Sequence, residues 1–163
     1  MVLAFAFALL GCEKATTTTT TAFTAPEAIT MAEVDNYLNN PDFQFVDLWN
    51  FDDQMADGWI RGFEMIPFFD YLEYTEILVR TDGNWSFAAE DVLDENAIKA
   101  LFDEDKYIVL MCASGTRAGF VKDALDSLGY EHVYNAGGLS GYDGDNMVLG
   151  DGSYDFTMPA KEM

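Results

Sequence analysis

The chain has 163 residues, a length that suits one domain and leaves no room for two of ordinary size. Half of the residues are hydrophobic and 15% are aromatic, so the sequence can build a core and is not a disordered tail. The 29 Asp and Glu residues outnumber the 8 Lys and Arg residues and give a formal net charge of −21. Because nucleic acids and anionic membrane faces are bound chiefly through Lys and Arg, this charge argues against nonspecific polyanion binding.

The cysteine and histidine counts limit the possible chemistry. The sequence holds two cysteines, Cys12 and Cys112, and one histidine, His132. These are too few for a zinc site made of Cys and His, and we expect neither a metal nor a cofactor. An acidic stretch over 143–146 lacks the ligand spacing of an EF-hand, so we interpret it as a solvated turn rather than a calcium loop. We interpret His132 as a surface or strand residue.

The first 11 residues are apolar and are followed at once by Cys12. A helix needs roughly 20 apolar residues to span a bilayer, so this run is too short, but it fits the apolar stretch of an export signal. Residues 9–12 (Leu-Leu-Gly-Cys) resemble the bacterial lipoprotein box, although no Lys or Arg precedes the apolar run. The resemblance implies export, with a lipid on Cys12 that anchors the chain to the cell envelope. The alternative is an apolar N-terminal helix packed on the domain.

Residues 12–25 have the composition of a tether. They contain six consecutive threonines (16–21), show no apolar periodicity and are followed by Pro26. Such a segment cannot bury enough surface to fold. We therefore predict a single domain over 26–163, which contacts a membrane only through the lipid on Cys12.

The first part of the domain gives short, weak signals. Thr30 and Glu33 have the spacing of a capping box, which predicts a helix with Met31, Val34 and Leu38 on one face. The ranges that follow predict a strand over 43–47, a short helix over 51–57, a turn over 58–62 and a short strand over 63–67. The pattern of residues 68–93 is harder to interpret.

The second part of the domain gives the clearest elements. Asp94 can cap a helix, and residues 107–111 are continuously apolar, as expected of a central parallel strand that leads directly into Cys112. After a five-residue loop, a helix with apolar residues four apart ends at Gly129, and a strand over 132–135 follows. This order predicts an α/β fold in which an open, mainly parallel sheet has helices on both faces.

The loop after the central strand carries the candidate chemistry. Its residues are Cys112, Ala113, Ser114, Gly115, Thr116 and Arg117. Between a strand and a helix N-terminus, backbone N–H groups converge on one point and, with the helix dipole, stabilise an anion such as a thiolate. Gly115 allows a backbone conformation that a side chain would resist, and Arg117 adds a positive fork for an anionic substrate. The alternative is a buried structural cysteine, since free cysteines are among the most buried residues.

Four segments, taken together and in order, cover roughly residues 30–142. They are residues 45–48 (Phe-Val-Asp-Leu), residues 58–67 (Gly-Trp-Ile-Arg-Gly-Phe-Glu-Met-Ile-Pro), the loop 112–117, and residues 129–138 (Gly-Tyr-Glu-His-Val-Tyr-Asn-Ala-Gly-Gly). This ordered set resembles the rhodanese (sulfurtransferase) family and implies a rhodanese-like fold. The chain departs from the family pattern at Trp49, where an Arg is usual, at Trp59 in place of His, and at Arg61 in place of Pro. Residues 68–94 are also longer than a minimal single-domain rhodanese needs.

The resemblance implies a reaction at Cys112. The cysteine would take a sulfane sulfur from a small anionic donor such as thiosulfate and form a persulfide, which a thiol or cyanide then removes. The backbone amides of 113–117 would hold the persulfide, and Arg117 would orient the donor. The hydroxyls of Ser114 and Thr116 either add donors to the site or cap the following helix.

Two residues outside the loop are expected to support the site. Asp47 ends the strand predicted over 43–47, where it orients the site or accepts a structural hydrogen bond. Trp59 is expected either as a packing residue or at the mouth of the pocket.

Two other functions stay open. Cysteine-dependent phosphatases and arsenate reductases of a related type carry five residues between Cys and Arg, whereas the four residues 113–116 here favour sulfur over phosphate. Other rhodanese-like domains are non-catalytic binding or regulatory modules, although these often lack the cysteine. The predicted partners are an anionic sulfur donor and a thiol acceptor, and we expect a monomer that binds no nucleic acid.

Overall fold

The structure is a computed structural model that describes residues 23–150. The predicted export signal (1–11), the lipidation site Cys12 and most of the predicted tether lie outside these residues. Among residues 23–150, no helix has the length and apolar character needed to cross a membrane. The ring of Phe23, a residue of the predicted tether, lies 5.6 Å from that of Phe43 and 5.2 Å from that of Tyr107. The packed part of the chain therefore includes residues before Pro26.

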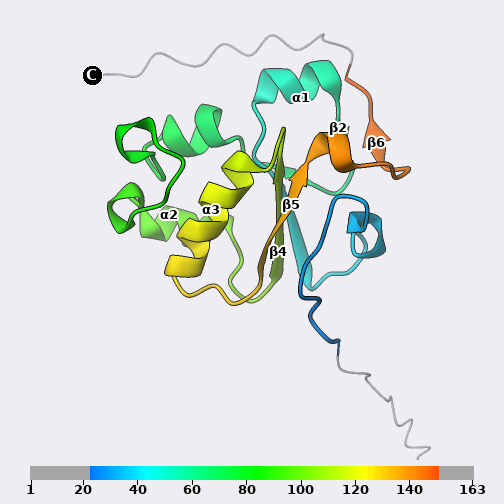
Figure 1. Cartoon of the computed structure of the whole chain (residues 1–163), viewed down its shortest axis with the longest axis horizontal. Helices are drawn as coiled ribbons and strands as arrows, with labels where there is room; N and C mark the ends of the chain where they lie inside the picture. Colours follow the sequence, from blue (N-terminus) through cyan, green and yellow to red (C-terminus); the bar gives the residue numbers. More distant parts are fainter. Residues whose placement is uncertain (1–22, 151–163) are drawn as a thin grey trace, which may run out of the picture.

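A four-stranded parallel sheet forms the centre of the fold (Figure 1). Its strands are β1 (Phe43–Asp47), β3 (Glu64–Met65), β4 (Tyr107–Cys112) and β5 (Val133–Gly138), in the order β3-β1-β4-β5. Both strands are buried on both faces, which accounts for the continuous apolar run of β4. The predicted mainly parallel sheet is confirmed, as are the predicted positions of these two strands.

Alternate residues of the central strands face two separate apolar clusters. In β4, Ile108, Leu110 and Cys112 belong to the cluster covered by α2 (Glu95–Leu101) and α3 (Thr116–Ser127). Val109 and Met111 belong to the other cluster, which the N-terminal segment covers with the 3₁₀ helix η1 (Val34–Asn36). The alternation follows from the two-residue period of a strand and explains how one strand can be apolar throughout. The predicted helix cap of α2 is also present, since the Asp94 carboxylate accepts a hydrogen bond from Ala97 N at 2.9 Å.

The helix predicted around residues 30–38 is wrong. The capping contact itself forms, because the Glu33 carboxylate accepts hydrogen bonds from the backbone N and the hydroxyl of Thr30 at 3.0 and 2.7 Å. Only η1 follows, however, and Met31 N donates instead to the carbonyl of Ala136 in β5 at 3.1 Å. This segment covers one face of the sheet and is attached to β5 by this bond, so contacts with the sheet, and not the local capping signal, set its backbone.

The predicted short helix is confirmed as α1 (Phe51–Asp57), which lies over the carboxyl edge of the sheet (Figure 1). The predicted turn after it is wrong in part, because it contains the strand β2 (Trp59–Ile60), which pairs antiparallel with β6 (Met147–Val148). Gly58 makes this pairing possible. Its φ is +108°, and a Cβ there would lie 2.2 Å from the carbonyl oxygen of Val148. A short 3₁₀ helix, η5 (Leu139–Gly141), completes the connection from β5.

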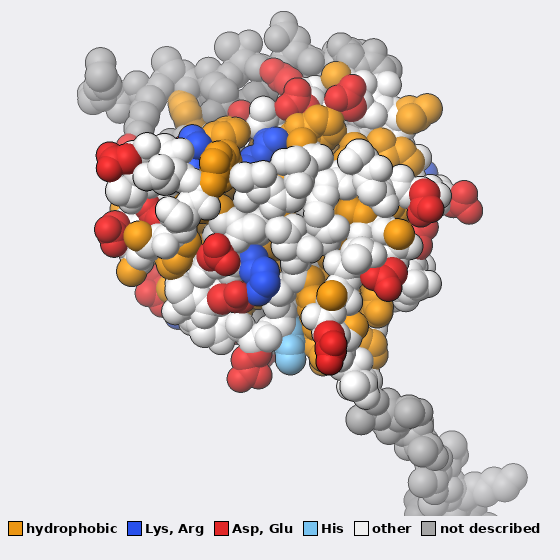
Figure 2. All heavy atoms as spheres, viewed as in Figure 1, with side chains coloured by type: hydrophobic (Ala, Val, Ile, Leu, Met, Phe, Trp, Pro, Cys, Tyr) orange, Lys and Arg blue, Asp and Glu red, His pale blue; other side chains and the backbone are white. Residues whose placement is uncertain are grey.

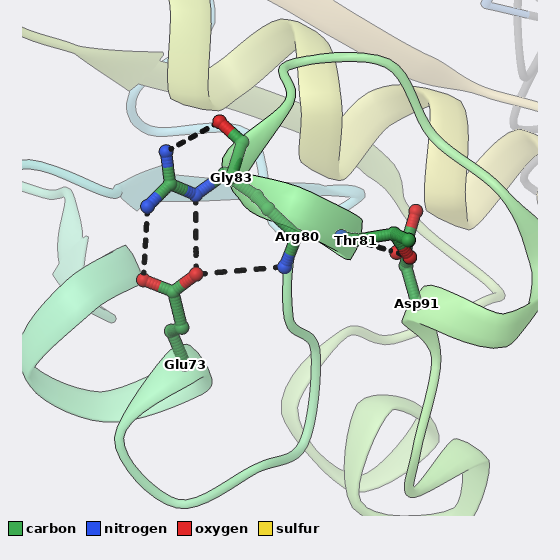
Figure 3. A network of polar contacts seen from close by, with 5 residues as sticks. All are labelled: Glu73, Arg80, Thr81, Gly83 and Asp91. Atoms are coloured by element: carbon green, nitrogen blue, oxygen red, sulfur yellow. Dashed lines mark hydrogen bonds and ion pairs between the residues drawn. The ribbon is translucent and has the colours of Figure 1, made fainter.

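The segment after β3 consists of three short helices, η2 (Phe68–Glu73), η3 (Thr81–Gly83) and η4 (Ala89–Asp91). Arg80 ties the first two together (Figure 3). Its guanidinium forms two hydrogen bonds with the Glu73 carboxylate, at 3.1 and 3.3 Å, and one with the Gly83 carbonyl at 3.3 Å. Periodicity does not predict these turns, because each is stabilised by a side chain from another turn.

Asp91 holds the other side of this segment. Its buried carboxylate accepts hydrogen bonds from the backbone N of Thr81 at 2.8 Å and of Ala88 at 2.6 Å, and from the Thr81 hydroxyl. Burial raises the pKa of Asp91, but these hydrogen bonds outweigh burial and bring the pKa below its ordinary value. The site therefore favours the ionised form of the Asp91 carboxylate.

We predict that Asp91→Ala destabilises the protein by about 2 kcal/mol, because it removes a buried carboxylate that accepts three hydrogen bonds from Thr81 and Ala88. Urea unfolding of the variant and of the wild type measures the difference. Glu90→Ala is the matched control, since it removes the same charge from the exposed neighbouring position. Equal losses in the two variants would contradict a specific role for Asp91.

Candidate active site

Cys112 is the last residue of β4, and α3 begins four residues later at Thr116. The loop between them has three residues, not the five we predicted, so Thr116 and Arg117 belong to the first turn of the helix. Gly115 N donates a hydrogen bond to Sγ of Cys112 at 3.1 Å. The sulfur therefore lies at the N-terminus of a twelve-residue helix, where the helix dipole favours a negative charge.

Glycines let this loop lie directly against the end of β5. Gly115 has a φ of +89°, which glycine adopts readily. A Cβ at Gly138 would lie only 2.3 Å from the carbonyl oxygen of Ala113. Gly138 is opposite Cys112 in the pairing of β4 with β5. A side chain at position 138 would therefore push the loop away from the sheet.

The Cys112 side chain is a free thiol with no exposed surface. It belongs to the apolar cluster that α2 and α3 cover. Both interpretations of the cysteine thus have support, since its position is that of a nucleophile and its burial is that of a packing residue. Any reaction at Sγ needs a movement that admits the substrate.

Arg117 is held at the start of α3 by two residues from other parts of the chain. Its Nη1 donates to Oδ1 of Asn50 at 2.7 Å, and its guanidinium carbon lies 5.5 Å from the centre of the Phe69 ring. Among residues 23–150, the ion pairs involve Arg80, Lys99, Lys106 and Lys122. Within that part of the chain, Arg117 is thus a positioned cation that forms no ion pair, although it interacts electrostatically with the buried Asp47.

Sequence reasoning missed Asn50 and Phe69. Asn50 comes directly after the 45–48 motif and Trp49, so its place could have marked it as a site residue. Phe69 lies in the segment whose pattern was hard to interpret, and nothing in the sequence pointed to it.

The hydroxyls of Ser114 and Thr116 lie 3.1 Å apart and form a hydrogen bond with each other. The residue at the N-cap position of α3 is Gly115, and no side chain caps the helix there. Of the two alternatives for these hydroxyls, helix capping is therefore wrong, and a role as donors to the site stays a prediction. The only loop amide with a hydrogen bond to Sγ among the described contacts is that of Gly115.

Asp47 is buried beside the site, at the end of β1 and opposite Met111 of β4. Its Oδ1 accepts a hydrogen bond from Trp49 N at 2.9 Å, so it is a structural acceptor as expected. Gln54 is buried next to it and donates from Nε2 to the Trp49 carbonyl at 3.0 Å. Within the described chain, Oδ2 of Asp47 and Oε1 of Gln54 have no hydrogen-bond partner.

This environment makes ionisation of Asp47 costly. Burial raises the pKa of the Asp47 carboxyl to about 6, against the opposing effects of the Trp49 hydrogen bond, the positive charge of Arg117 and the Gln54 side chain. A rise from 3.8 to about 6 corresponds to about 3 kcal/mol. Ionised Asp47, which interacts with Arg117, thus lowers the free energy of unfolding by this amount.

The other two residues considered from the sequence, Trp59 and His132, make their described contacts outside the Cys112 loop. Trp59 is half-buried in β2, paired with Val148. The exposed His132 stacks on Tyr107, the first residue of β4, with 4.5 Å between ring centroids, at the end opposite to Cys112. Within residues 23–150, no group of three or more His, Cys, Asp or Glu residues is arranged to hold a metal.

A family model of the rhodanese-like domain matches residues 30–145. The chain belongs to the rhodanese-like family. A rhodanese-like domain protein from Staphylococcus aureus is similar in structure, with a TM-score of 0.51 and 18% identity over 76% of this chain and 98% of that one. A structure of rhodanese with anions from E. coli has a TM-score of 0.43 and 22% identity, over 66% of this chain and 99% of that one. A search of curated proteins gives no match.

Membership of the rhodanese-like family places the chain in the sulfurtransferase superfamily. It confirms the family that the four sequence motifs predicted, and the likeness to the S. aureus structure confirms the fold. The matched range contains Cys112, Arg117 and the residues that contact them. The rhodanese-like domain thus includes the whole candidate site.

We predict that Asp47 makes the protein less stable as the pH rises. The folded state binds a proton that the unfolded state loses between about pH 4 and pH 6, so the free energy of unfolding falls across that window and stays lower above it. Asp47→Asn removes this effect, and its stability relative to the wild type should increase by about 2 kcal/mol between pH 4 and pH 7.

Urea unfolding at several pH values measures this difference. Asp52→Asn, at an exposed position of α1, is the control and should keep the wild-type dependence on pH. If Asp47→Asn also keeps that dependence, Asp47 is not the group responsible.

Proposed function

We propose that this chain is a sulfurtransferase that moves a sulfane sulfur from a small anionic donor to a thiol or cyanide through a persulfide on Cys112. The observation that carries the proposal is the 3.1 Å hydrogen bond from Gly115 N to Sγ at the N-terminus of α3. A negative sulfur is stabilised in such a place, both as a thiolate and as a persulfide. Membership of the rhodanese-like family supports the same chemistry.

The reaction has two balanced steps. In the first, the Cys112 thiolate attacks the outer sulfur of thiosulfate, the bond from that sulfur to the sulfite group breaks, and sulfite leaves with the electron pair. In the second, a thiolate or cyanide attacks the outer sulfur of the persulfide and the Cys112 thiolate leaves. Neither step needs an outside oxidant or reductant, because the sulfur passes between nucleophiles.

Arg117 is suited to bind the anionic donor. It is held by the neutral Asn50 amide and the Phe69 ring, so these contacts do not neutralise its charge. The chain as a whole has a net charge of −21, and Figure 2 shows acidic side chains spread over one face. The field of the whole protein therefore repels an anion, and the local positive charge of Arg117 and the helix N-terminus must overcome it.

A second candidate function is a non-catalytic binding module, and one observation favours it. The Cys112 side chain has no exposed surface, as expected of a cysteine that only packs. The two candidates differ in a measurable property, namely whether Sγ can accept and release a sulfur atom.

We predict that incubation with thiosulfate adds the mass of one sulfur atom to the protein, and that Cys112→Ser abolishes both this gain and sulfur transfer to cyanide. Intact-mass analysis and thiocyanate formation are the measurements. Cys12→Ser is the matched control and should keep both activities, because it removes the other cysteine of the chain.

Absence of Cys112-dependent transfer from thiosulfate, a persulfide and a polysulfide would overturn the enzyme proposal in favour of the binding module. Cleavage of a phosphate ester that depends on Cys112 would instead identify a phosphatase.

We predict that Asn50→Ala raises the KM for thiosulfate about tenfold at most, since it removes one hydrogen bond that positions Arg117. Asn50→Asp should raise the KM further, because a carboxylate would neutralise the guanidinium. Asn50 is the N-cap residue of α1 but makes no capping hydrogen bond, so neither change removes a cap.

Steady-state kinetics measure the KM, and thermal unfolding checks that α1 is intact. Asn39→Asp places the same charge at an exposed position before β1 and serves as the control. A KM that is the same in Asn50→Asp and in the control would contradict this role of Asn50.

A further inference from the structure

We propose that Asn135 is a positioning residue for the sulfur-binding loop, and that its side-chain amide sets the direction of the Gly115 N–H toward Cys112. The proposal rests on the sulfurtransferase function proposed above, and it names a residue that neither the motifs nor the resemblance assigned to the site. Asn135 lies in β5, so its effect on the sulfur passes through the loop and not through direct contact.

The amide of Asn135 bridges β5 and the loop with both of its polar atoms. Its Nδ2 donates to the Gly115 carbonyl at 2.9 Å, and its Oδ1 accepts a hydrogen bond from Gly137 N at 3.0 Å. The first bond crosses from the strand to the start of α3. The second holds the amide in the orientation that the first one needs.

A register shift in the sheet explains why the amide can make these contacts. Leu110 is paired with Asn135, but the next residue of β4, Met111, is paired with Gly137, which leaves Ala136 as an extra residue in β5. Such a shift interrupts the ladder of hydrogen bonds and redirects nearby side chains. Asn135 compensates by taking the Gly137 N–H itself, in the short turn that Asn side chains favour.

Gly115 alone connects Asn135 to the Cys112 sulfur, because it forms a hydrogen bond with each of them. The Gly115 N–H donates to Sγ, and the carbonyl of the same residue accepts from Asn135 and from Gly119 N at 2.8 Å. Gly115 has a φ of +89° and, as a glycine, has a wide choice of other conformations. Fixing its carbonyl from two sides restricts that choice and keeps the N–H directed at Cys112.

Gly119 gives independent support for this arrangement. A Cβ at position 119 would lie 3.3 Å from Nδ2 of Asn135, closer than side chains normally pack. A glycine in the first turns of a helix lowers its stability, because alanine is the better helix former. At position 119 it leaves room for the Asn135 amide beside the Gly115 carbonyl.

The chemistry requires a neutral group that both donates and accepts. An aspartate at position 135 could still accept from Gly137 N, but it has no N–H for the Gly115 carbonyl. It would also bring a negative charge toward a loop that must hold an anionic sulfur. Asn135→Asp therefore keeps the contact that supports the sheet and removes the contact that supports the loop.

The test compares Asn135→Asp and Gly119→Ala with the wild type, in full chains that carry Cys12→Ser so that Cys112 is the only thiol. Asn39→Asp is the charge control, because it adds the same charge at an exposed position before β1. The first measurement is hydrogen exchange of the Gly115 amide by NMR. The second is kcat and KM for sulfur transfer from thiosulfate to cyanide, and the third is thermal unfolding.

We expect the Gly115 amide to exchange about tenfold faster in Asn135→Asp, the change that loss of one hydrogen bond produces. We expect kcat to fall by about the same factor. KM for thiosulfate should change little in Gly119→Ala, which leaves Arg117 undisturbed and adds no charge, and should rise in Asn135→Asp, because the new carboxylate repels the anionic donor. Gly119→Ala should raise the unfolding temperature and yet speed Gly115 exchange and lower kcat. A residue that only supports the fold would not give this opposite movement of stability and activity.

Two results would overturn the inference. One is Gly115 exchange equal to that of the control in both Asn135→Asp and Gly119→Ala. The other is faster exchange with an unchanged kcat in an active enzyme. A wild type that transfers no sulfur while its Gly115 exchange depends on Asn135 would overturn the proposed function and leave the loop contact established.

Discussion

The close approach of the Cys112 loop to the end of β5 is the constraint on which the rest of the site depends. A Cβ at Gly138 would lie 2.3 Å from the Ala113 carbonyl oxygen, so the loop can lie here only against a glycine. This approach places Gly115 within reach of both Cys112 and Asn135. It also fixes where α3 begins, and with it the position of Arg117 in the first helical turn. Backbone contacts thus link the end of β5, the start of α3 and Cys112. Side chains of the loop do not make these contacts.

The charge of the chain gives the second constraint. With 29 acidic residues against 8 basic ones, a guanidinium would be expected to lie beside a carboxylate, as Arg80 does beside Glu73. Arg117 instead contacts an amide and an aromatic ring. Asp47 is the carboxyl group whose pKa responds to Arg117, and it is buried at the end of β1. Arg117 therefore keeps a positive charge for a ligand inside a strongly acidic protein, which is consistent with a site for a small anion.

The sequence predicted the elements whose signals are local. The continuous apolar run of β4 and the spacing of apolar residues in α3 depend only on neighbours in the chain, and the 112–117 motif is contiguous, so the loop could be located. The contacts that complete the site join residues far apart, since Arg117 and Asn50 are separated by 67 positions and Asn135 and Gly115 by 20. No periodicity records such pairs. The helix expected around residues 30–38 is shortened to η1 in a segment that packs on the sheet and bonds to Ala136 of β5, and no local pattern records that contact.

Asn50 and Asn135 act in the same way at two places in the site: each is positioned by its neighbours and forms one hydrogen bond to the site. The backbone of Trp49 is held at both ends, its N–H by Asp47 and its carbonyl by Gln54, and this places Asn50 at the start of α1. The register shift of β5 and the Gly137 N–H orient Asn135 in the same way. Each asparagine then contacts one working part of the loop, Asn50 the guanidinium and Asn135 the Gly115 carbonyl. Carboxylates could not replace them, because a negative charge at either place would neutralise Arg117 or repel an anionic sulfur. Neutral amides are the side chains that can hold an anion-binding loop in place without competing with the anion for it.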